Sequence, residues 1–250
     1  VVIEGIKAAV PDLPESCGLH LFGNKQDAEA LLAKNPQIKF SHTQEFISMG
    51  EHPVKALLSK PTNSLTLGLK ALASKEICAF ASAGHSGALM VAAMQILGLQ
   101  QGFSRPVAAS FIPTLAGNAH LLLDVGANAD SKADNIVESA ILGANYFTNS
   151  TGQENPQVFL LNTGEEPTKG RQLHQTAYQL LQENKEIRFC GNLEVRELFT
   201  SPACVLVTDG YTGNIVLKQT EGFFKVAQAR QLKDSFISKL NYENYGGSPL

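Results

Sequence analysis

The sequence predicts an α/β protein built on a mostly parallel β-sheet that is covered by helices on both faces. A unit of short apolar strand, glycine-rich polar loop and helix occurs four times along the chain. Strands such as 158–161 and 204–207 are apolar without interruption, which is typical of parallel strands buried on both faces. The helices that follow carry apolar residues three and four positions apart, and strands alternating with helices favour a parallel sheet.

The individual elements are expected in the following order. The chain starts in a helix and continues with strands at 19–22 and 38–41, helices at 26–34 and 64–74, and a strand at 106–113. The four repeated units cover 77–98, 120–147, 158–181 and 204–225. Asp134 and Thr168 are the predicted N-caps of two of these helices. No linker marks a domain boundary, so residues 1–250 are expected to form a single α/β chain, and a division into two intertwined subdomains stays open.

Composition indicates an ordinary globular protein. The chain has 250 residues, of which 44% are hydrophobic and 17% charged, and a formal net charge of −3, which does not favour nucleic acid as a partner. No apolar run approaches the roughly 20 residues that span a bilayer, and no signal-peptide pattern begins the chain. The sequence therefore predicts a cytoplasmic protein, with four reduced cysteines expected in the core: Cys17, Cys78, Cys190 and Cys204.

The four glycine-rich loops predict a binding site for phosphate. Loops that leave the C-terminal ends of parallel strands meet at one edge of a sheet. Small residues let backbone N–H groups approach an anion, and the following helix N-terminus favours negative charge. The first two loops would bind an anion through backbone amides and the hydroxyls of Ser82 and Ser86. The alternative is that the glycines only make tight turns.

Lys169 in the third loop is the most conspicuous cation, because 77–167 holds only Arg105 and Lys132. We expect Lys169 at the head of a helix, where an ammonium group opposes the helix dipole and is better tolerated beside an anion. The alternative is a solvated lysine that pairs with Glu165 or Glu166.

A second motif points to different chemistry. The sequence "GHSGA" resembles a nucleophile elbow, which would make Ser86 a hydrolase nucleophile with His85 as its general base. The fifth position is alanine, however, and "SAGH" separates the serine from the preceding strand, so the hydrolase is disfavoured. The later histidines are poorly placed for a catalytic triad, because His120 precedes a strand and His174 lies one turn into a helix. His20, His42 and His52 lack the spacing of metal ligands, so we predict no metal site. A nicotinamide dehydrogenase is disfavoured because no loop carries G-x-G-x-x-G with a ribose-binding acid.

Seven segments of the chain carry a family resemblance, in this order: "SAGHSGALM", "RPVAASFIPT", "LLLDVGANAD", "LLNTGEEPTKG", "GNLEVRE", "VTDGYTGNIVLKQTEG" and "YGGSPL". Together they resemble the PlsX-type phosphate acyltransferases of bacterial phospholipid synthesis. The resemblance implies a three-layer α/β/α fold, similar to phosphotransacetylases and isopropylmalate dehydrogenases. It implies a homodimer that transfers a long-chain fatty acyl group from acyl carrier protein to orthophosphate, without a cofactor.

The resemblance also implies the site residues. The catalytic lysine and asparagine of the family correspond to Lys169 in "EEPTKG" and Asn214 in "TGN". Our hypothesis is that Lys169 holds the attacking phosphate and that Asn214 donates to the developing oxyanion. We expect four polar residues to orient the loops and the lysine, with a capping or turn role as the alternative: Asp124, Asn128, Glu166 and Asp209. The expected phosphate- or substrate-binding residues are Ser82, Gly84, His85, Ser86, Gly87, Asn128, Thr212 and Gly213.

The chain departs from the family pattern in three places. His85 and Ser86 replace asparagine and threonine, and Leu57 and Leu58 replace cationic positions that suit an acidic carrier protein. Segments before residue 1, after residue 228 and after residue 250 are expected to be missing. Related chains carry an apolar helical hairpin after position 228, so the hypothesis is a peripheral contact with the inner face of the cell membrane.

Two alternative functions remain. One is a short-chain phosphotransacetylase that uses coenzyme A, and the other is an inactive phosphate-binding or membrane-scaffold relative.

Overall fold

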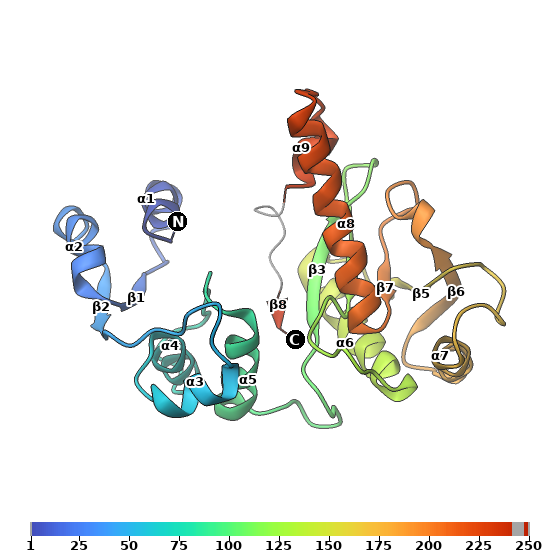
Figure 1. Ribbon diagram of the computed structural model, residues 1–250, viewed down its shortest axis with the longest axis horizontal. Coiled ribbons are helices and arrows are strands. Elements are labelled where there is room, and N and C mark those ends of the chain that lie inside the picture. Colours follow the sequence, from blue (N-terminus) through green and yellow to red (C-terminus); the bar gives the residue numbers. More distant parts are fainter. Residues whose placement is uncertain (1, 242–247, 250) are drawn as a thin grey trace. The chain divides into compact units, whose positions relative to one another are not determined.

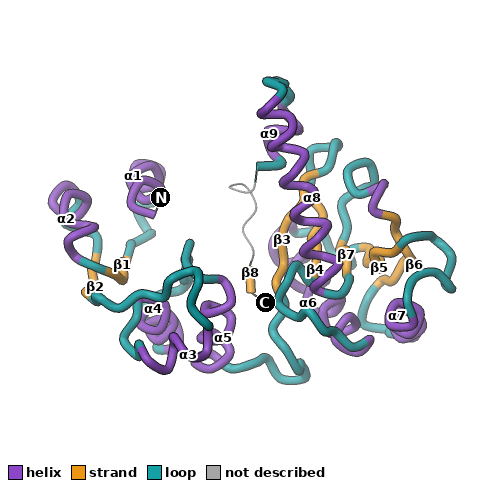
Figure 2. Tube along the Cα trace, viewed as in Figure 1, coloured by secondary structure: helices purple, strands orange, loops and turns teal. Residues whose placement is uncertain are grey.

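The computed structural model describes residues 2–241 and 248–249. The chain divides after Gln100 into two compact units (Figures 1 and 2). The N-terminal unit contains a two-stranded parallel sheet of β1 and β2. Its elements are α1 (Val2–Ala9), the 3-10 helix η1 (Val10–Asp12), β1 (His20–Gly23), α2 (Lys25–Lys34), β2 (Lys39–His42), α3 (Pro53–Ser59), α4 (Ser64–Ala73) and α5 (Ser86–Leu97).

The C-terminal unit is built on a six-stranded sheet with the strand order β6-β5-β7-β4-β3-β8. The pairs β4–β7, β7–β5 and β5–β6 are parallel, whereas β3 pairs antiparallel with β4 and β8. Its elements are β3 (Ala108–Pro113), β4 (Ala119–Leu123), α6 (Ala133–Thr151), β5 (Gln157–Asn162), α7 (Gln172–Glu183), β6 (Arg188–Glu194), the 3-10 helix η2 (Val195–Glu197), β7 (Val205–Val207), α8 (Gly210–Ala229), α9 (Ser235–Lys239) and β8 (Ser248–Pro249).

Helices cover both faces of this sheet. On one face Ile136 and Phe147 of α6 and Leu181 of α7 pack with alternate strand residues, all of them buried. On the other face Val216 of α8 packs with Leu122 and its neighbours. The C-terminal unit is therefore a three-layer α/β/α structure, and the predicted mostly parallel α/β fold is confirmed.

The observed strands differ from the predicted ones in two places: one predicted strand is absent, and one observed strand was not predicted. The first of the four repeated units was expected to begin with a strand at 77–80, which is absent. Cys78 and Ala79 are exposed, and Phe80 packs on helices instead of pairing in a sheet. The Phe80 ring covers Gly68 of α4 so closely that a Cβ on Gly68 would lie 2.0 Å from it. Strand β6 was missed, because the edge strand "RFCGNLE" alternates exposed and half-buried residues in its first half and has no continuous apolar run.

The predicted helix caps and core cysteines also needed correction. Helix α6 begins one residue before Asp134, because the backbone N–H of Lys132 donates to the Asn135 side chain at 2.9 Å. Thr168 lies in a loop, and Arg171 is the N-cap residue of α7. Cys204 is buried as expected. The other three cysteines are exposed: Cys17, Cys78 and Cys190.

Candidate active site

Three loops of the C-terminal unit begin at the same edge of the sheet. Strands β5, β7 and β4 lie side by side and run parallel, so their C-terminal ends meet at one edge. Residues 124–132 follow β4, residues 163–171 follow β5, and the start of α8 follows β7. This is the edge where open α/β sheets bind ligands. Eight of the predicted site residues therefore lie in segments at one edge of the sheet: Asp124, Asn128, Glu166, Lys169, Asp209, Thr212, Gly213 and Asn214.

Asp124 organises the loop after β4. Its carboxylate is buried and accepts hydrogen bonds from the backbone N–H groups of Gly126, Ala127 and Asn128, at 2.8–3.0 Å. The Asn128 side-chain amide donates to the same carboxylate at 2.9 Å and to the carbonyl of Pro106 at 2.8 Å. The charge of Asp124 therefore serves to shape the loop, and the Asn128 amide is occupied by this framework.

Asn214 lies against that loop. It is exposed on the first turns of α8, and a Cβ on Gly126 would lie 3.0 Å from its amide nitrogen. Gly126 has a φ of +127°, so glycine is needed there both for the backbone conformation and for the close approach. A shallow groove of about 410 Å³ adjoins Asn214, and its lining residues are Tyr211, Asn214, Ile215, Lys218 and Gln219.

The loop that carries Lys169 is held by side-chain amides. Buried Asn162, at the end of β5, donates to the Lys169 carbonyl at 3.2 Å, and Asn192 of β6 donates to the Glu166 carbonyl at 2.9 Å. Gln175 of α7 donates to the carbonyl of Thr168 at 2.7 Å. The loop backbone is therefore fixed from three elements, although the loop is exposed.

The Lys169 side chain extends from this framework into solvent. About half of it is exposed, and its ammonium group lies 3.8 Å from the carboxylate of Glu166, which is itself exposed. Lys169 lies two residues before the N-cap of α7 rather than at the head of the helix. Pairing with Glu166 was one of the two alternatives, and at this distance and exposure it leaves the ammonium accessible to a second anion.

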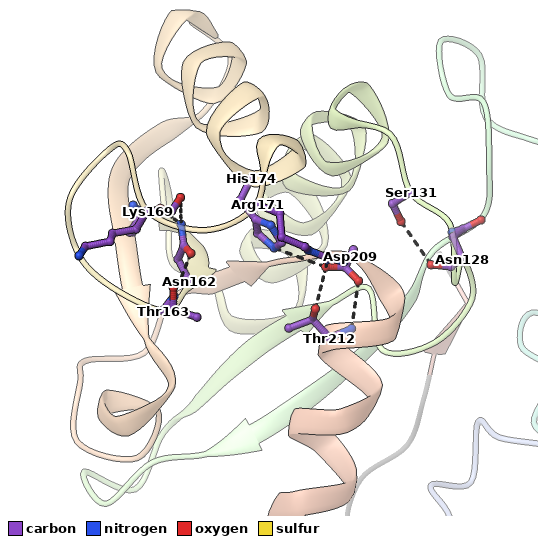
Figure 3. A network of polar contacts seen from close by, with 10 residues as sticks. Asn128, Ser131, Asn162, Thr163, Lys169, Arg171, His174, Asp209 and Thr212 are labelled. Atoms are coloured by element: carbon purple, nitrogen blue, oxygen red, sulfur yellow. Dashed lines mark hydrogen bonds and ion pairs between the residues drawn. The ribbon is translucent and has the colours of Figure 1, made fainter.

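Asp209 links the Lys169 loop to α8 (Figure 3). This buried residue is the N-cap of α8, and its carboxylate accepts hydrogen bonds from the Thr212 N–H at 3.1 Å and hydroxyl at 2.7 Å. Arg171 donates to it at 2.8 Å, and Nε2 of His174 lies 3.4 Å away. Burial favours the neutral acid, but hydrogen bonds from His174 and Thr212, together with the charge of Arg171, hold the pKa of Asp209 well below its ordinary value.

Sequence reasoning missed Arg171 and His174 as members of this site. His174 is considered from the sequence only as a hydrolase histidine, for which its place one turn into a helix is unsuitable, and Arg171 is not singled out. The available signal was the second cation in "TKGR", two residues after the candidate lysine. The contact itself follows from the pairing of β5 with β7, which are separated along the chain by α7 and β6.

The first glycine loop belongs to the N-terminal unit. The Ser82 hydroxyl accepts from the Gly84 N–H at 3.1 Å, and a Cβ on Gly87 would lie 3.2 Å from the His85 ring. His85 is the N-cap of α5, because its Nδ1 accepts from the Ala88 N–H at 3.3 Å. A histidine can therefore fill the capping role that asparagine often fills.

This geometry counts against the hydrolase. With Nδ1 of His85 accepting a hydrogen bond, its Nε2 carries the proton and faces the Glu51 carbonyl oxygen at 3.1 Å. Neither ring nitrogen is then available to take a proton from Ser86. Within residues 2–241 and 248–249, no group of three or more His, Cys, Asp and Glu side chains could hold a metal ion. No helix in the described part of the chain is long and apolar enough to cross a membrane.

Comparison with known proteins identifies the family. A family model described as "Fatty acid synthesis protein" matches residues 1–243. A phosphate acyltransferase from Streptococcus agalactiae is 42% identical over 221 residues, which amount to 88% of this chain and 67% of that protein. The chain belongs to the family of PlsX-type phosphate acyltransferases. The family resemblance inferred from the glycine loops is thus confirmed.

A second phosphate acyltransferase, from Bacillus licheniformis, is 37% identical over 269 residues, covering 100% of this chain and 81% of that protein. Those 269 aligned positions exceed the 250 residues of the chain, so this relative has at least 19 residues without a counterpart here.

Solved structures of phosphotransacylases share the fold. The EutD phosphotransacetylase from Staphylococcus aureus has a TM-score of 0.58 at 19% identity, covering 92% of this chain and 80% of that chain. A branched-chain phosphotransacylase from Enterococcus faecalis V583 has a TM-score of 0.61 at 13% identity, covering 89% of this chain and 80% of that chain. At these identities the likeness shows the fold alone, and it confirms the expected similarity to phosphotransacetylases.

Proposed function

We propose that this phosphate acyltransferase moves a long-chain fatty acyl group from acyl carrier protein to orthophosphate, with Lys169 and Asn214 as the catalytic residues. The observation that carries the proposal is their placement. Both side chains are exposed on segments that follow neighbouring parallel strands, and each segment is fixed by buried polar residues: Asn162 and Asn192 for one, Asp209 for the other.

The reaction needs these two groups for different reasons. A phosphate oxygen attacks the carbonyl carbon of the thioester, a C–O bond forms, and the C–S bond breaks to release the carrier protein thiol. Lys169 neutralises phosphate and orients the attacking oxygen, which lowers the entropic part of the barrier. The Asn214 amide donates to the oxygen that becomes negative in the tetrahedral intermediate. The thioester is already activated, so no covalent enzyme intermediate is required.

The remaining loop residues support phosphate binding in this proposal. Thr212 and Gly213 present the first turn of α8, and the loop shaped by Asp124 and Asn128 adjoins it. Within the N-terminal unit, a separate anion-binding element is proposed at the N-terminus of α5, made by Ser82, Gly84, His85, Ser86 and Gly87. Glu166 orients the ammonium group of Lys169.

The test is the formation of acyl phosphate from palmitoyl-acyl carrier protein and orthophosphate, measured by trapping with hydroxylamine. Lys169→Ala and Asn214→Ala should each lower turnover by about a hundredfold or more. Lys185→Ala is the matched control, because Lys185 is an exposed lysine in the turn between α7 and β6. Turnover near wild type in both site variants would show that the site is misplaced.

Two further measurements distinguish the proposed function from its two alternatives. Efficient turnover with acetyl-coenzyme A in place of the carrier-protein thioester would favour a short-chain phosphotransacetylase. A folded protein that binds phosphate without turnover would favour an inactive relative. The proposal also includes a homodimer, which analytical ultracentrifugation tests, and a peripheral membrane contact, which sedimentation with anionic phospholipid vesicles tests.

A further inference from the structure

A single carboxylate oxygen connects the two segments that carry the candidate catalytic residues. Oδ2 of Asp209 meets the Thr212 hydroxyl at 2.7 Å, Nη2 of Arg171 at 2.8 Å and Nε2 of His174 at 3.4 Å. Thr212 belongs to α8, two residues before Asn214. Arg171 and His174 belong to the start of α7, and Arg171 lies two residues after Lys169 (Figure 3).

The two donors from α7 differ in exposure. The Arg171 side chain is 63% exposed, so water and salt screen its charge and its contact with Asp209 is readily exchanged for solvent. The His174 side chain is only 7% exposed, and Asp209 is 3% exposed. Water does not reach a contact between two buried groups, so the 3.4 Å contact of His174 with Asp209 is not exchanged for solvent as the shorter Arg171 contact is.

The contact with Asp209 is the polar contact that the His174 ring makes in the described part of the chain. Its Nδ1 is buried, and no hydrogen-bond partner for it is found in the described part of the chain. A buried polar atom without a partner costs stability and calls for an explanation beyond packing. A leucine of similar volume would fill the position without that cost, so the polar contact of Nε2 with Asp209 is the feature that distinguishes histidine here.

We propose that His174 is a positioning residue, which through Asp209 fixes the Lys169 loop relative to the helix that carries Asn214. His174 does not touch the substrate in this inference. Its effect on turnover rests on the proposed function, because it acts through Lys169 and Asn214. Its effect on the two segments is a property of the fold alone, and the two can be measured separately.

The test compares two substitutions at position 174 in the full chain. The amide nitrogen of His174→Gln can replace the Nε2–H donor, whereas His174→Leu keeps a similar side-chain volume and removes the donor. Hydrogen exchange followed by mass spectrometry should show faster exchange of both 163–171 and 210–214 in His174→Leu, by about tenfold, and little change in His174→Gln. His120→Leu is the matched control. In the described part of the C-terminal unit His120 is the second buried histidine, and its ring is hydrogen-bonded to Cys204 rather than to Asp209.

Kinetics with palmitoyl-acyl carrier protein and orthophosphate provide the second measurement. His174→Leu should lower kcat by about tenfold and leave KM for the acyl donor within about twofold, and His174→Gln should recover most of kcat. At equal folded fraction, His120→Leu should retain wild-type kcat. Unchanged exchange in both segments for His174→Leu would overturn the inference, as would equal defects in the leucine and glutamine variants. The exchange measurement needs no substrate, so it decides the inference even if wild-type protein makes no acyl phosphate and the proposed function fails.

Discussion

Gly213 of α8 lies directly against the backbone of Asp124 at the end of β4. A Cβ added at Gly213 would be 1.9 Å from the Asp124 carbonyl oxygen, which is far inside van der Waals contact. The same residue is buried and follows Thr212, whose backbone N–H donates to the carboxylate of the N-cap residue Asp209. The first turn of α8 can therefore approach the loop after β4 only because this position is glycine.

Gly213→Ala should destabilise the protein severely, by about 3 kcal/mol or more, because a backbone oxygen cannot move away as a flexible side chain could. Gly222→Ala in the same helix is the control. Nothing lies within 4 Å of a Cβ at Gly222, so alanine there should raise the free energy of unfolding by about 0.5–1 kcal/mol. Urea denaturation followed by circular dichroism measures both. Equal effects of the two substitutions would contradict the close approach.

The cysteines provide a chemical test of the fold. Burial, with a smaller contribution from Cys190, raises the pKa of Cys204 to about 12, whereas the other three cysteines are exposed. Because the thiolate is the reactive form, iodoacetamide at pH 8 should label three cysteines of the folded protein and spare Cys204. All four should be labelled in urea. Peptide mass spectrometry gives the result, and rapid labelling of Cys204 in the folded protein would show that β7 is not buried as described.

Strands β4, β5 and β7 could be predicted from the sequence because they are buried on both faces. A strand such as Val205–Val207 has no polar position, and its flanking loop carries the turn residues that end it. The run at 77–80 is equally apolar, but Phe80 packs on Gly68 instead. Four apolar residues satisfy either arrangement, so periodicity alone could not separate them.

The candidate site was predictable to the extent that it depends on loops leaving one sheet edge. Lys169 and Asn214 were assigned from family motifs, and the structure places both at that edge. The contact of Asp209 with His174 and Arg171 depends on strand order, which places β7 beside β5 although β6 intervenes in the sequence. Sequence spacing holds no information on that order, so the buried contact could not be foreseen.

The charge of Asp209 should make stability depend on pH in acid. Its pKa is lowered in the folded protein, whereas the unfolded value is about 3.9. Its contribution is therefore fully present above about pH 4 and is lost as the pH falls toward the folded value. Asp209→Asn should cost about 1–3 kcal/mol near pH 7, and the difference from wild type should shrink below about pH 4. Denaturation at a series of pH values measures this, and a difference that is constant with pH would contradict it.

Asn192 is the residue whose loss should release the Lys169 loop. It is 8% exposed, and its amide nitrogen donates to the carbonyls of Glu166 at 2.9 Å and Glu165 at 3.4 Å, while its oxygen accepts from Asn162 at 3.2 Å. Asn192→Asp keeps the shape but turns the donor into an oxygen that faces carbonyl oxygens. We expect a loss of about 1–3 kcal/mol in stability, with a fall in kcat because the position of Lys169 is no longer fixed.

Asn184→Asp separates this effect from the general effect of an added charge. Asn184 lies in the exposed turn before β6, where its side-chain oxygen accepts from the Glu186 N–H at 2.8 Å, and aspartate retains that acceptor. Stability and kcat of Asn184→Asp should therefore stay near wild type. If Asn192→Asp matched this control in unfolding free energy and in acyl phosphate formation, the loop would not depend on the buried amide. If it lost kcat with wild-type stability, the amide would act on the position of Lys169 without contributing to global folding.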